Sequence, residues 1–218
     1  MATLSIVGCS QSMFSYVLAY MADRKPPTTR TWVINRMALV LQQADMCVAM
    51  DDRRWMQRQK QYRGVAKKID SVGMPVMTSK VYPEYPNSVE YPLSYVLERV
   101  SCGNVLKNSV NFALALGIAR RFKAITLWGC DFSPNDEYGT VKLYQETTPR
   151  WRAYYTEEGQ RPTSEPGLEQ TTWLMGLAEE RGIDVRLPLN ATLLERDRPH
   201  YLYGYMENPL FPDTTNET

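Results

Sequence analysis

The sequence predicts an α/β fold, a single doubly wound, mostly parallel Rossmann-like sheet with helices on both faces. Short apolar strand patterns alternate with helical patterns along most of the chain. The length of 218 residues is enough for one well-buried core but would be cramped for two. The stretch 109–132 reads as a helix of small residues, then a buried strand that ends in a Gly-x-Asp-Phe turn. In such a sheet, ligands bind at the carboxyl ends of the strands.

The elements follow from the pattern of apolar, proline and glycine residues. Strands are expected at residues 4–8, 30–34, 45–50, 75–78, 124–128 and 183–187. One helix is expected between the first strand and about residue 22. Further helices are expected at 36–42, 53–68, 93–100, 108–121 and 168–181. Three prolines make residues 81–92 an irregular loop that cannot be a central strand. One domain is expected to span residues 1–218, with a lid or long loop at 133–167 and a surface tail at 197–218.

Composition narrows the class of protein. No apolar run approaches the roughly 20 residues that span a bilayer, and the N-terminus lacks a signal-like segment, so no membrane partner is expected. The four cysteines lie far apart, without C-x-x-C spacing, which favours reduced and mostly buried thiols over disulfides or zinc ligands. A cytoplasmic protein is predicted.

Positive charge is concentrated in one segment although the net charge is only +1. Residues 53–68 contain no acid and carry the cations Arg53, Arg54, Arg58, Lys60, Arg63, Lys67 and Lys68. Such a segment could contact the phosphates of a nucleic acid, with Trp55 and Tyr62 available for stacking. The alternative is a solvated helix face.

Polar residues stand at the ends of five expected strands, and in a parallel sheet all of these ends lie along one edge. They are Gly8, Ser10 and Ser12 after the first strand, Asn35, Asp51 and Asp52, Ser79, and Gly129 with Asp131. Backbone N–H groups and hydroxyls of the first turn could hold a phosphate at a helix N-terminus. Each residue also has a plainer interpretation as a turn or helix cap.

The acidic residues suggest two further roles. Asp51 and Asp52 could hold Mg²⁺ or Mn²⁺ on a diphosphate, or they could cap the following helix. With such a metal the general base would be a carboxylate, for which Asp131, Glu165 and Glu169 are the candidates, and Asp52 is a further catalytic candidate. Asp131 could instead only cap its turn.

Taken in order, these motifs resemble a group of small phage and bacterial Rossmann-like proteins. This group is related to the CMP-sialic-acid-dependent sialyltransferases and to the 6-hydroxymethylpterin pyrophosphokinase-like, motility-accessory-factor proteins. The motifs that carry the resemblance are the turn at 8–12 and residues 33–35, 50–52, 78–79, 108–109 and 127–132. The resemblance covers most of residues 4–205.

The resemblance implies a nucleotide-sugar pocket. Gly8 to Ser12, Asn35, Asn108 and Ser109 would contact the nucleotide. The sialyltransferase branch uses a histidine as general base and needs no metal, which points to His200, the single histidine of this chain. The host compartment would be the cytoplasm of an infected bacterium if the chain is phage-encoded.

Three functions remain open at this point. The first is a glycosyltransferase that moves a sugar from a nucleotide donor to a hydroxyl acceptor. The second is a pyrophosphokinase-like or nucleotidyl transferase, and the third is a non-catalytic binder of nucleotides or nucleotide sugars. For the first, the leading acceptor is a hydroxymethyl pyrimidine in double-stranded phage DNA. Its phosphates would be contacted by Arg53, Arg54, Arg58 and Lys60, beside the strand-end acids.

Overall fold

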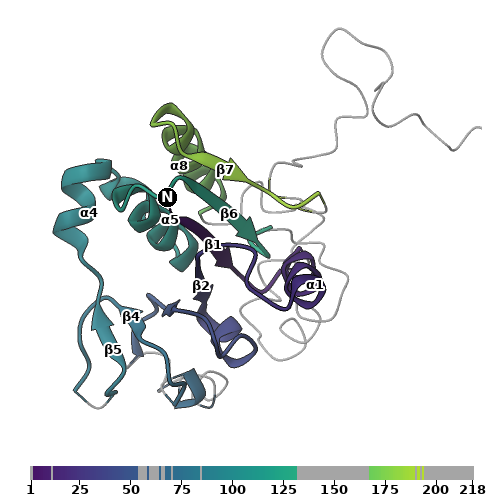
Figure 1. The fold of residues 1–218 in the computed structure, drawn as a ribbon. Helices are drawn as coiled ribbons and strands as arrows, with labels where there is room; N and C mark the ends of the chain where they lie inside the picture. Colours follow the sequence, from purple (N-terminus) through teal and green to yellow (C-terminus); the bar gives the residue numbers. More distant parts are fainter. Residues whose placement is uncertain are drawn as a thin grey trace, which may run out of the picture.

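The computed structural model describes residues 2–10, 12–53, 58, 64, 67–69, 71–83, 85–131, 167–189, 191 and 193. Its described part contains a seven-stranded sheet in the order β5-β4-β3-β2-β1-β6-β7, and every paired strand is parallel to its neighbour (Figure 1). The predicted fold class is therefore confirmed. The expected lid and surface tail lie outside the described residues, apart from Gly167.

The strands are short, and the five inner ones are mostly apolar. They are β1 (Thr3–Val7), β2 (Arg30–Ile34), β3 (Met46–Val48), β4 (Val76–Thr78), β5 (Ser88–Glu90), β6 (Ala124–Trp128) and β7 (Asp184–Arg186). The helices are α1 (Met13–Asp23), α4 (Leu93–Val100), α5 (Ser109–Ala119) and α8 (Leu168–Glu180), with short 3-10 turns η1 (Asn35–Leu39) and η2 (Gly103–Val105). The helix expected at 36–42 is thus only a 3-10 turn.

The strand β5 was not expected, because the segment that contains it was interpreted as an irregular loop. It pairs with β4 alone and forms one edge of the sheet. Pro86 and Pro92 stand just outside it. Proline is tolerated there because an edge strand needs hydrogen-bond donors on one side only. The prolines therefore excluded a central strand but not an edge strand.

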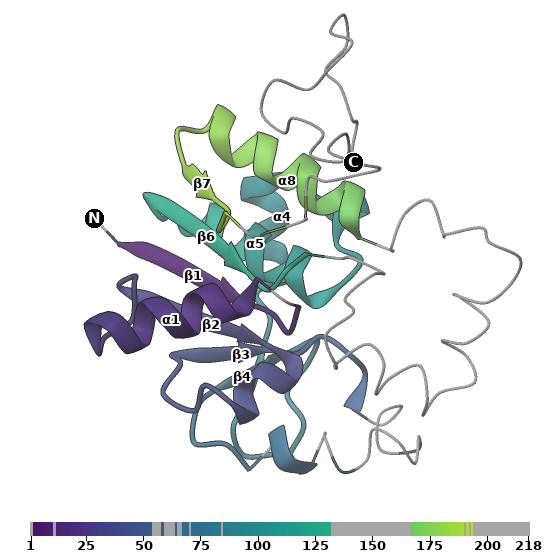
Figure 2. The ribbon, with the colours of Figure 1, turned by 90° about the vertical axis from the view of Figure 1, so that its right-hand side faces the viewer.

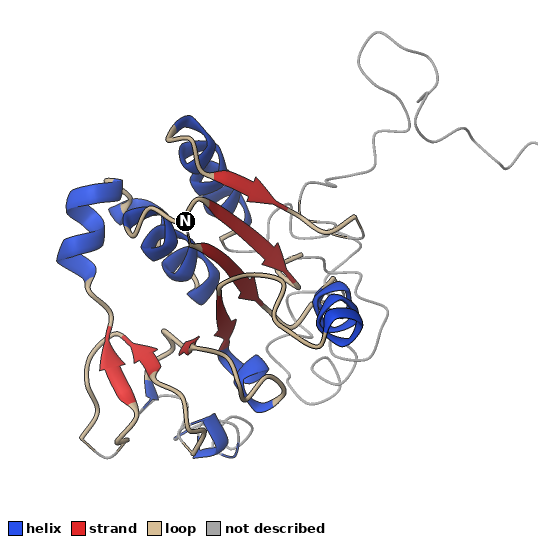
Figure 3. Cartoon of the chain, in the orientation of Figure 1, coloured by secondary structure: helices blue, strands red, loops and turns tan. Residues whose placement is uncertain are grey.

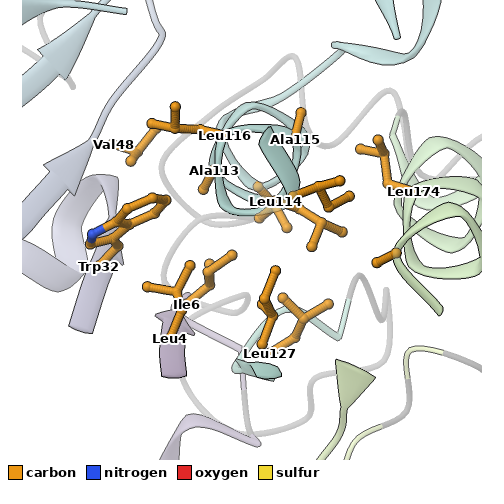
Figure 4. Close-up of a cluster of buried hydrophobic side chains, with 14 of the residues drawn as sticks. Leu4, Ile6, Trp32, Val48, Ala113, Leu114, Ala115, Leu116, Leu127 and Leu174 are labelled. Atoms are coloured by element: carbon orange, nitrogen blue, oxygen red, sulfur yellow. The ribbon is translucent and has the colours of Figure 1, made fainter. Parts of the chain in front are cut away.

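Two apolar layers hold helices on the two faces of the sheet (Figure 2). On one face, Leu4, Ile6 and Leu127 pack with α5 and α8, and Figure 4 shows α5 over these strands. On the other face, Val7 and Val33 pack with Tyr16 of α1 and with the η1 turn. Helix α5 is buried on nearly all sides, which explains its small and apolar composition.

Two expectations about the chain's environment can be compared with the structure. No helix in the described residues is long and apolar enough to cross a membrane. The four cysteines all lie in the described residues and form no disulfide there, and Cys47, Cys102 and Cys130 are buried, as predicted. Burial raises the pKa of the Cys130 thiol, which keeps it protonated and unreactive.

Candidate functional site

The carboxyl ends of β1 and β6 form the centre of the candidate site. These neighbouring strands lead into helices on opposite faces, because β1 continues into α1 and α8 precedes β7 on the other side. The strand order therefore reverses between β1 and β6. In open α/β sheets a crevice forms outside the strands at this reversal, and ligands bind there.

Gly8 and Gly129 bring the two strand ends into backbone contact. A Cβ built on Gly8 would lie 2.3 Å from the Gly129 carbonyl oxygen, so no side chain fits. Gly129 has a φ of 62°, in the left-handed region that favours glycine, and a Cβ there would lie 2.6 Å from the Gly8 oxygen. Both glycines thus serve the close approach of protein backbone to protein backbone.

Ser12 and Asp131 lock the same two turns together. The Ser12 backbone N–H donates to Asp131 Oδ2 at 2.8 Å, and the Ser12 hydroxyl donates to Oδ1 at 2.6 Å. The same hydroxyl accepts from the Gly129 N–H at 2.7 Å. Asp131 is only 4% exposed and Ser12 is fully buried. Asp131 is therefore a buried residue that joins the two turns.

These bonds change the interpretation of the first turn as a phosphate cradle. The N–H of Gly8 donates to the Trp128 oxygen, that of Ser10 to the Gly129 oxygen, and that of Ser12 to Asp131. Three of the donors expected to face a phosphate are consequently used within the protein. The turn is held in place at the carboxyl edge of the sheet, and Ser10 is half-buried there.

Asn35 has the most unusual environment among the predicted site residues. It follows β2 with a φ of 48°, a left-handed conformation that asparagine adopts more readily than most L-residues. Its side chain donates a hydrogen bond to Asp51. Its Oδ1 atom is buried without a hydrogen-bond partner among the described residues. Buried polar atoms are nearly always paired, so the unpaired acceptor makes Asn35 a candidate for contact with a ligand.

Asp51 lies opposite this amide, at the end of the chain segment that follows β3. Much of Asp51 is open to solvent, yet protein atoms packed around its carboxyl group raise its pKa. The Arg53 guanidinium and the hydrogen bond from Asn35 lower it in part. A carboxyl group with a raised pKa can exchange a proton closer to neutral pH than an ordinary one.

The start of α5 is fixed to the same edge by three polar residues. Asn108 caps the helix by accepting from the Asn111 N–H at 3.0 Å, and Ser109 Oγ accepts from the Met50 N–H at 3.1 Å. Asn111, fully buried, donates to the Gly167 oxygen and to Thr171 Oγ1, which joins the start of α5 to the start of α8. Asn111 was not predicted, although a lone amide in an otherwise apolar helix could have drawn attention.

Among the described residues, the surroundings of Asp51 do not fit a resident divalent cation. Asp51 already accepts from Asn35 and lies near the Arg53 cation, while Mg²⁺ and Mn²⁺ need several oxygen ligands around them. No group of three or more candidate ligands occurs in the described ranges. Asp52 and Ser79 are exposed at the ends of neighbouring strands.

The predicted nucleic-acid residues do not behave as one surface. Arg53 is fully buried, so its side chain is held inside the protein rather than on a face that DNA could touch. Arg58, Lys67 and Lys68 are exposed. The predicted contacts Arg54 and Lys60, like the predicted base His200, lie outside the described residues.

The fold is similar to that of solved sialyltransferases. A variant of CST-II in complex with CMP is 14% identical, with a TM-score of 0.55 over 90% of this chain and 85% of that chain. CstII from Campylobacter jejuni in complex with the substrate analogue CMP-3FNeuAc is 15% identical, with a TM-score of 0.50 over 90% and 84%. Cst-I from Campylobacter jejuni, a monofunctional alpha-2,3-sialyltransferase, is 12% identical, with a TM-score of 0.50 over 90% and 79%.

No protein-family model matches the sequence, and no curated protein sequence matches it either. At the identities given above, similarity of structure establishes the fold. The resemblance to sialyltransferases inferred from the motifs is confirmed at that level, and the resemblance to motility-accessory-factor proteins stays a prediction. The chain is therefore an α/β protein with the fold of the sialyltransferases.

Proposed function

We propose that this protein is a glycosyltransferase that uses a nucleotide sugar as donor, and that the donor binds at the carboxyl edge around Asn35. The observation that carries the proposal is the buried, unpaired Oδ1 of Asn35 beside the strand reversal. A base amino group or a ribose hydroxyl of a nucleotide would supply the missing donor. The sialyltransferases of similar fold were solved with CMP or an analogue of CMP-sialic acid, which supports a cytidine nucleotide as the first candidate.

The start of α5 favours the donor phosphate. An eleven-residue helix places the positive end of its dipole at this edge, and its first turn carries no acid. During transfer, the bond between the anomeric carbon and the phosphate oxygen breaks as a bond forms to the acceptor oxygen. The nucleoside phosphate leaves, and the acceptor's proton passes to a base.

The proposed bases are His200 and Asp52. Asp131 was the leading candidate, but both of its carboxylate oxygens accept hydrogen bonds from Ser12. A carboxylate engaged in this way is suited to hold the β1 and β6 turns in place. We therefore assign Asp131 to positioning the site rather than to proton transfer.

Binding of CMP, measured by titration calorimetry, tests the donor site. Asn35→Gly removes the amide and keeps a residue that tolerates the left-handed backbone, so the fold is expected to survive. Loss of one buried hydrogen bond should weaken binding about tenfold or more. Gln43→Ala, which removes an exposed amide at the opposite edge, is the control and should bind CMP normally. Equal affinity of Asn35→Gly and the unaltered protein would place the nucleotide elsewhere.

A panel of nucleotides and nucleotide sugars separates the alternatives. A donor consumed only with an acceptor supports sugar transfer, and movement of a phosphoryl or pyrophosphoryl group supports the pyrophosphokinase-like alternative. Tight binding without turnover supports a non-catalytic binder. If sugar transfer depends on a metal ion, EDTA should abolish the activity. An unchanged rate would leave Asp51 and Asp52 without a metal role.

For the acceptor, we propose a hydroxymethyl pyrimidine in DNA. The exposed Arg58 and the cationic composition of residues 53–68, close behind the strand-end acids, support this choice. Replacing Arg54, Arg58 and Lys60 by Ala should weaken DNA binding for any sequence and flatten its salt dependence, with CMP binding unchanged. Transfer of sugar to a free saccharide, together with no transfer to either the unmodified or the hydroxymethylated duplex, would reject DNA as the acceptor.

A further inference from the structure

Helix α1 carries apolar side chains on its outer side as well as its inner side. Tyr16 faces the sheet and is 2% exposed, whereas Phe14 is 54% exposed and Leu18 and Met21 are each 67% exposed. The spacing of four and three residues puts these three side chains on one line along the helix. We call them the α1 stripe. Figure 2 shows α1 outermost on its face of the sheet, with β1 and β2 behind it.

The same face of the sheet carries exposed positive charge. The η1 turn and residues 67–69 lie on the side of the sheet that α1 covers, since Met37 and Ile69 share an apolar cluster with Tyr16 (Figure 3). Exposed groups near these elements include the apolar Val40 and the cations Arg24, Lys25, Lys67 and Lys68. Asp23 is the exposed acid on α1, and Asp45 is paired with Arg30.

We propose that this face binds the surface of an anionic lipid bilayer, with the α1 stripe entering the boundary between headgroups and acyl chains. Arg24 and Lys25 are exposed and directly follow Asp23, the last residue of α1, so they flank the stripe at this end of the helix and can contact lipid phosphates. Apolar side chains flanked by cations are the pattern by which surface helices bind membranes without crossing them. Cations alone would also suit a nucleic acid, but a line of exposed Phe, Leu and Met gains nothing from phosphate contacts.

A second copy of the chain fits this surface less well. In an antiparallel pairing of two α1 helices, Arg24 of one copy would meet the first turn of the other, which has no acid and carries the positive end of the helix dipole. In a parallel pairing, the cations of the two copies would face each other. Charge therefore opposes both two-fold arrangements and favours an anionic partner.

Co-sedimentation of the full chain with vesicles tests the proposal. Vesicles of phosphatidylcholine with phosphatidylserine should bind the protein, and vesicles of phosphatidylcholine alone should bind it about tenfold less. The double variant Phe14→Ser, Leu18→Ser and the double variant Arg24→Gln, Lys25→Gln should each lower binding to the anionic vesicles about tenfold. All of these positions are exposed, so the fold and CMP binding should be unchanged.

Matched control variants lie elsewhere on the molecule. Leu93→Ser removes an exposed leucine of α4, which packs on the opposite face, and Lys123→Gln removes an exposed cation at the start of β6. Both should bind anionic vesicles like the unaltered protein. Equal binding of the α1 stripe variant and the unaltered protein would overturn the proposal. So would a dimer in sedimentation that dissociates when Phe14 and Leu18 are replaced, since a second copy would then cover the face.

Discussion

The Ser12–Asp131 pair gives the sharpest test of how the site is held. Asp131→Ala removes a buried carboxylate that accepts hydrogen bonds from the Ser12 N–H and hydroxyl, at 2.8 and 2.6 Å. Hydrogen bonds to charged groups contribute about 1.5–3 kcal/mol each, and both Ser12 donors would be left buried and unpaired. The free energy of unfolding should therefore fall by roughly 3–5 kcal/mol. Urea unfolding followed by circular dichroism measures this loss.

The control for this experiment is a carboxylate on the surface. Asp184→Ala removes the salt bridge between Asp184 and Arg186. Both side chains are about half exposed, so the free energy of unfolding should fall by less than about 1 kcal/mol. Ser12→Ala combined with Asp131→Ala should cost clearly less than the sum of the single changes, by about 1–3 kcal/mol, because the two residues act as a unit. A loss below about 1 kcal/mol for Asp131→Ala alone would refute the structural role.

Three further predictions concern the strand ends and the helix starts. Gly8→Ala should destabilise the fold by about 3 kcal/mol or more in thermal unfolding, because its Cβ meets the Gly129 oxygen, while Gly73→Ala, with open space around it, should not. Asn111→Ala should cost about 2–4 kcal/mol, since two hydrogen bonds between α5 and α8 are lost; a cost near zero would mean that apolar packing alone joins them. Because the pKa of Asp51 is raised, the folded state loses stability as the pH rises from the ordinary carboxyl value of 3.8 through the raised value. Asp51→Asn should abolish this decline above the ordinary carboxyl value, and an unchanged pH profile would assign it to other groups.

The sequence predicts the fold well where local pattern decides it. The segments around Leu4, Trp32 and Ile125 are short, apolar and bounded by turns, and each is a strand as expected. The edge strand β5 was not predicted, because it has only three residues and lies between prolines. The 3-10 turn η1 replaces a full helix, since the chain after Asn35 starts from a left-handed residue and soon returns to β3.

The site is predictable in its residue list but not in its bonding. Parallel strands place their carboxyl ends along one edge, so the positions of Asn35, Asp51 and Asp131 follow from the fold. The bond between Ser12 and Asp131 joins residues 119 positions apart, and no local pattern specifies it. Burial of Arg53 is equally hidden, because a run of cations normally indicates a solvated face.

Turnover of a nucleotide sugar is the most direct test of whether this protein is a glycosyltransferase. The full chain is incubated with CMP-sialic acid and other nucleotide sugars, with hydroxymethylated DNA or a free saccharide as acceptor, and the released nucleotide is measured. One donor should be consumed only when an acceptor is present, and Asn35→Gly should slow its consumption about tenfold or more. Failure of every donor to bind or react with folded protein would contradict the proposal of a glycosyltransferase at this edge of the sheet.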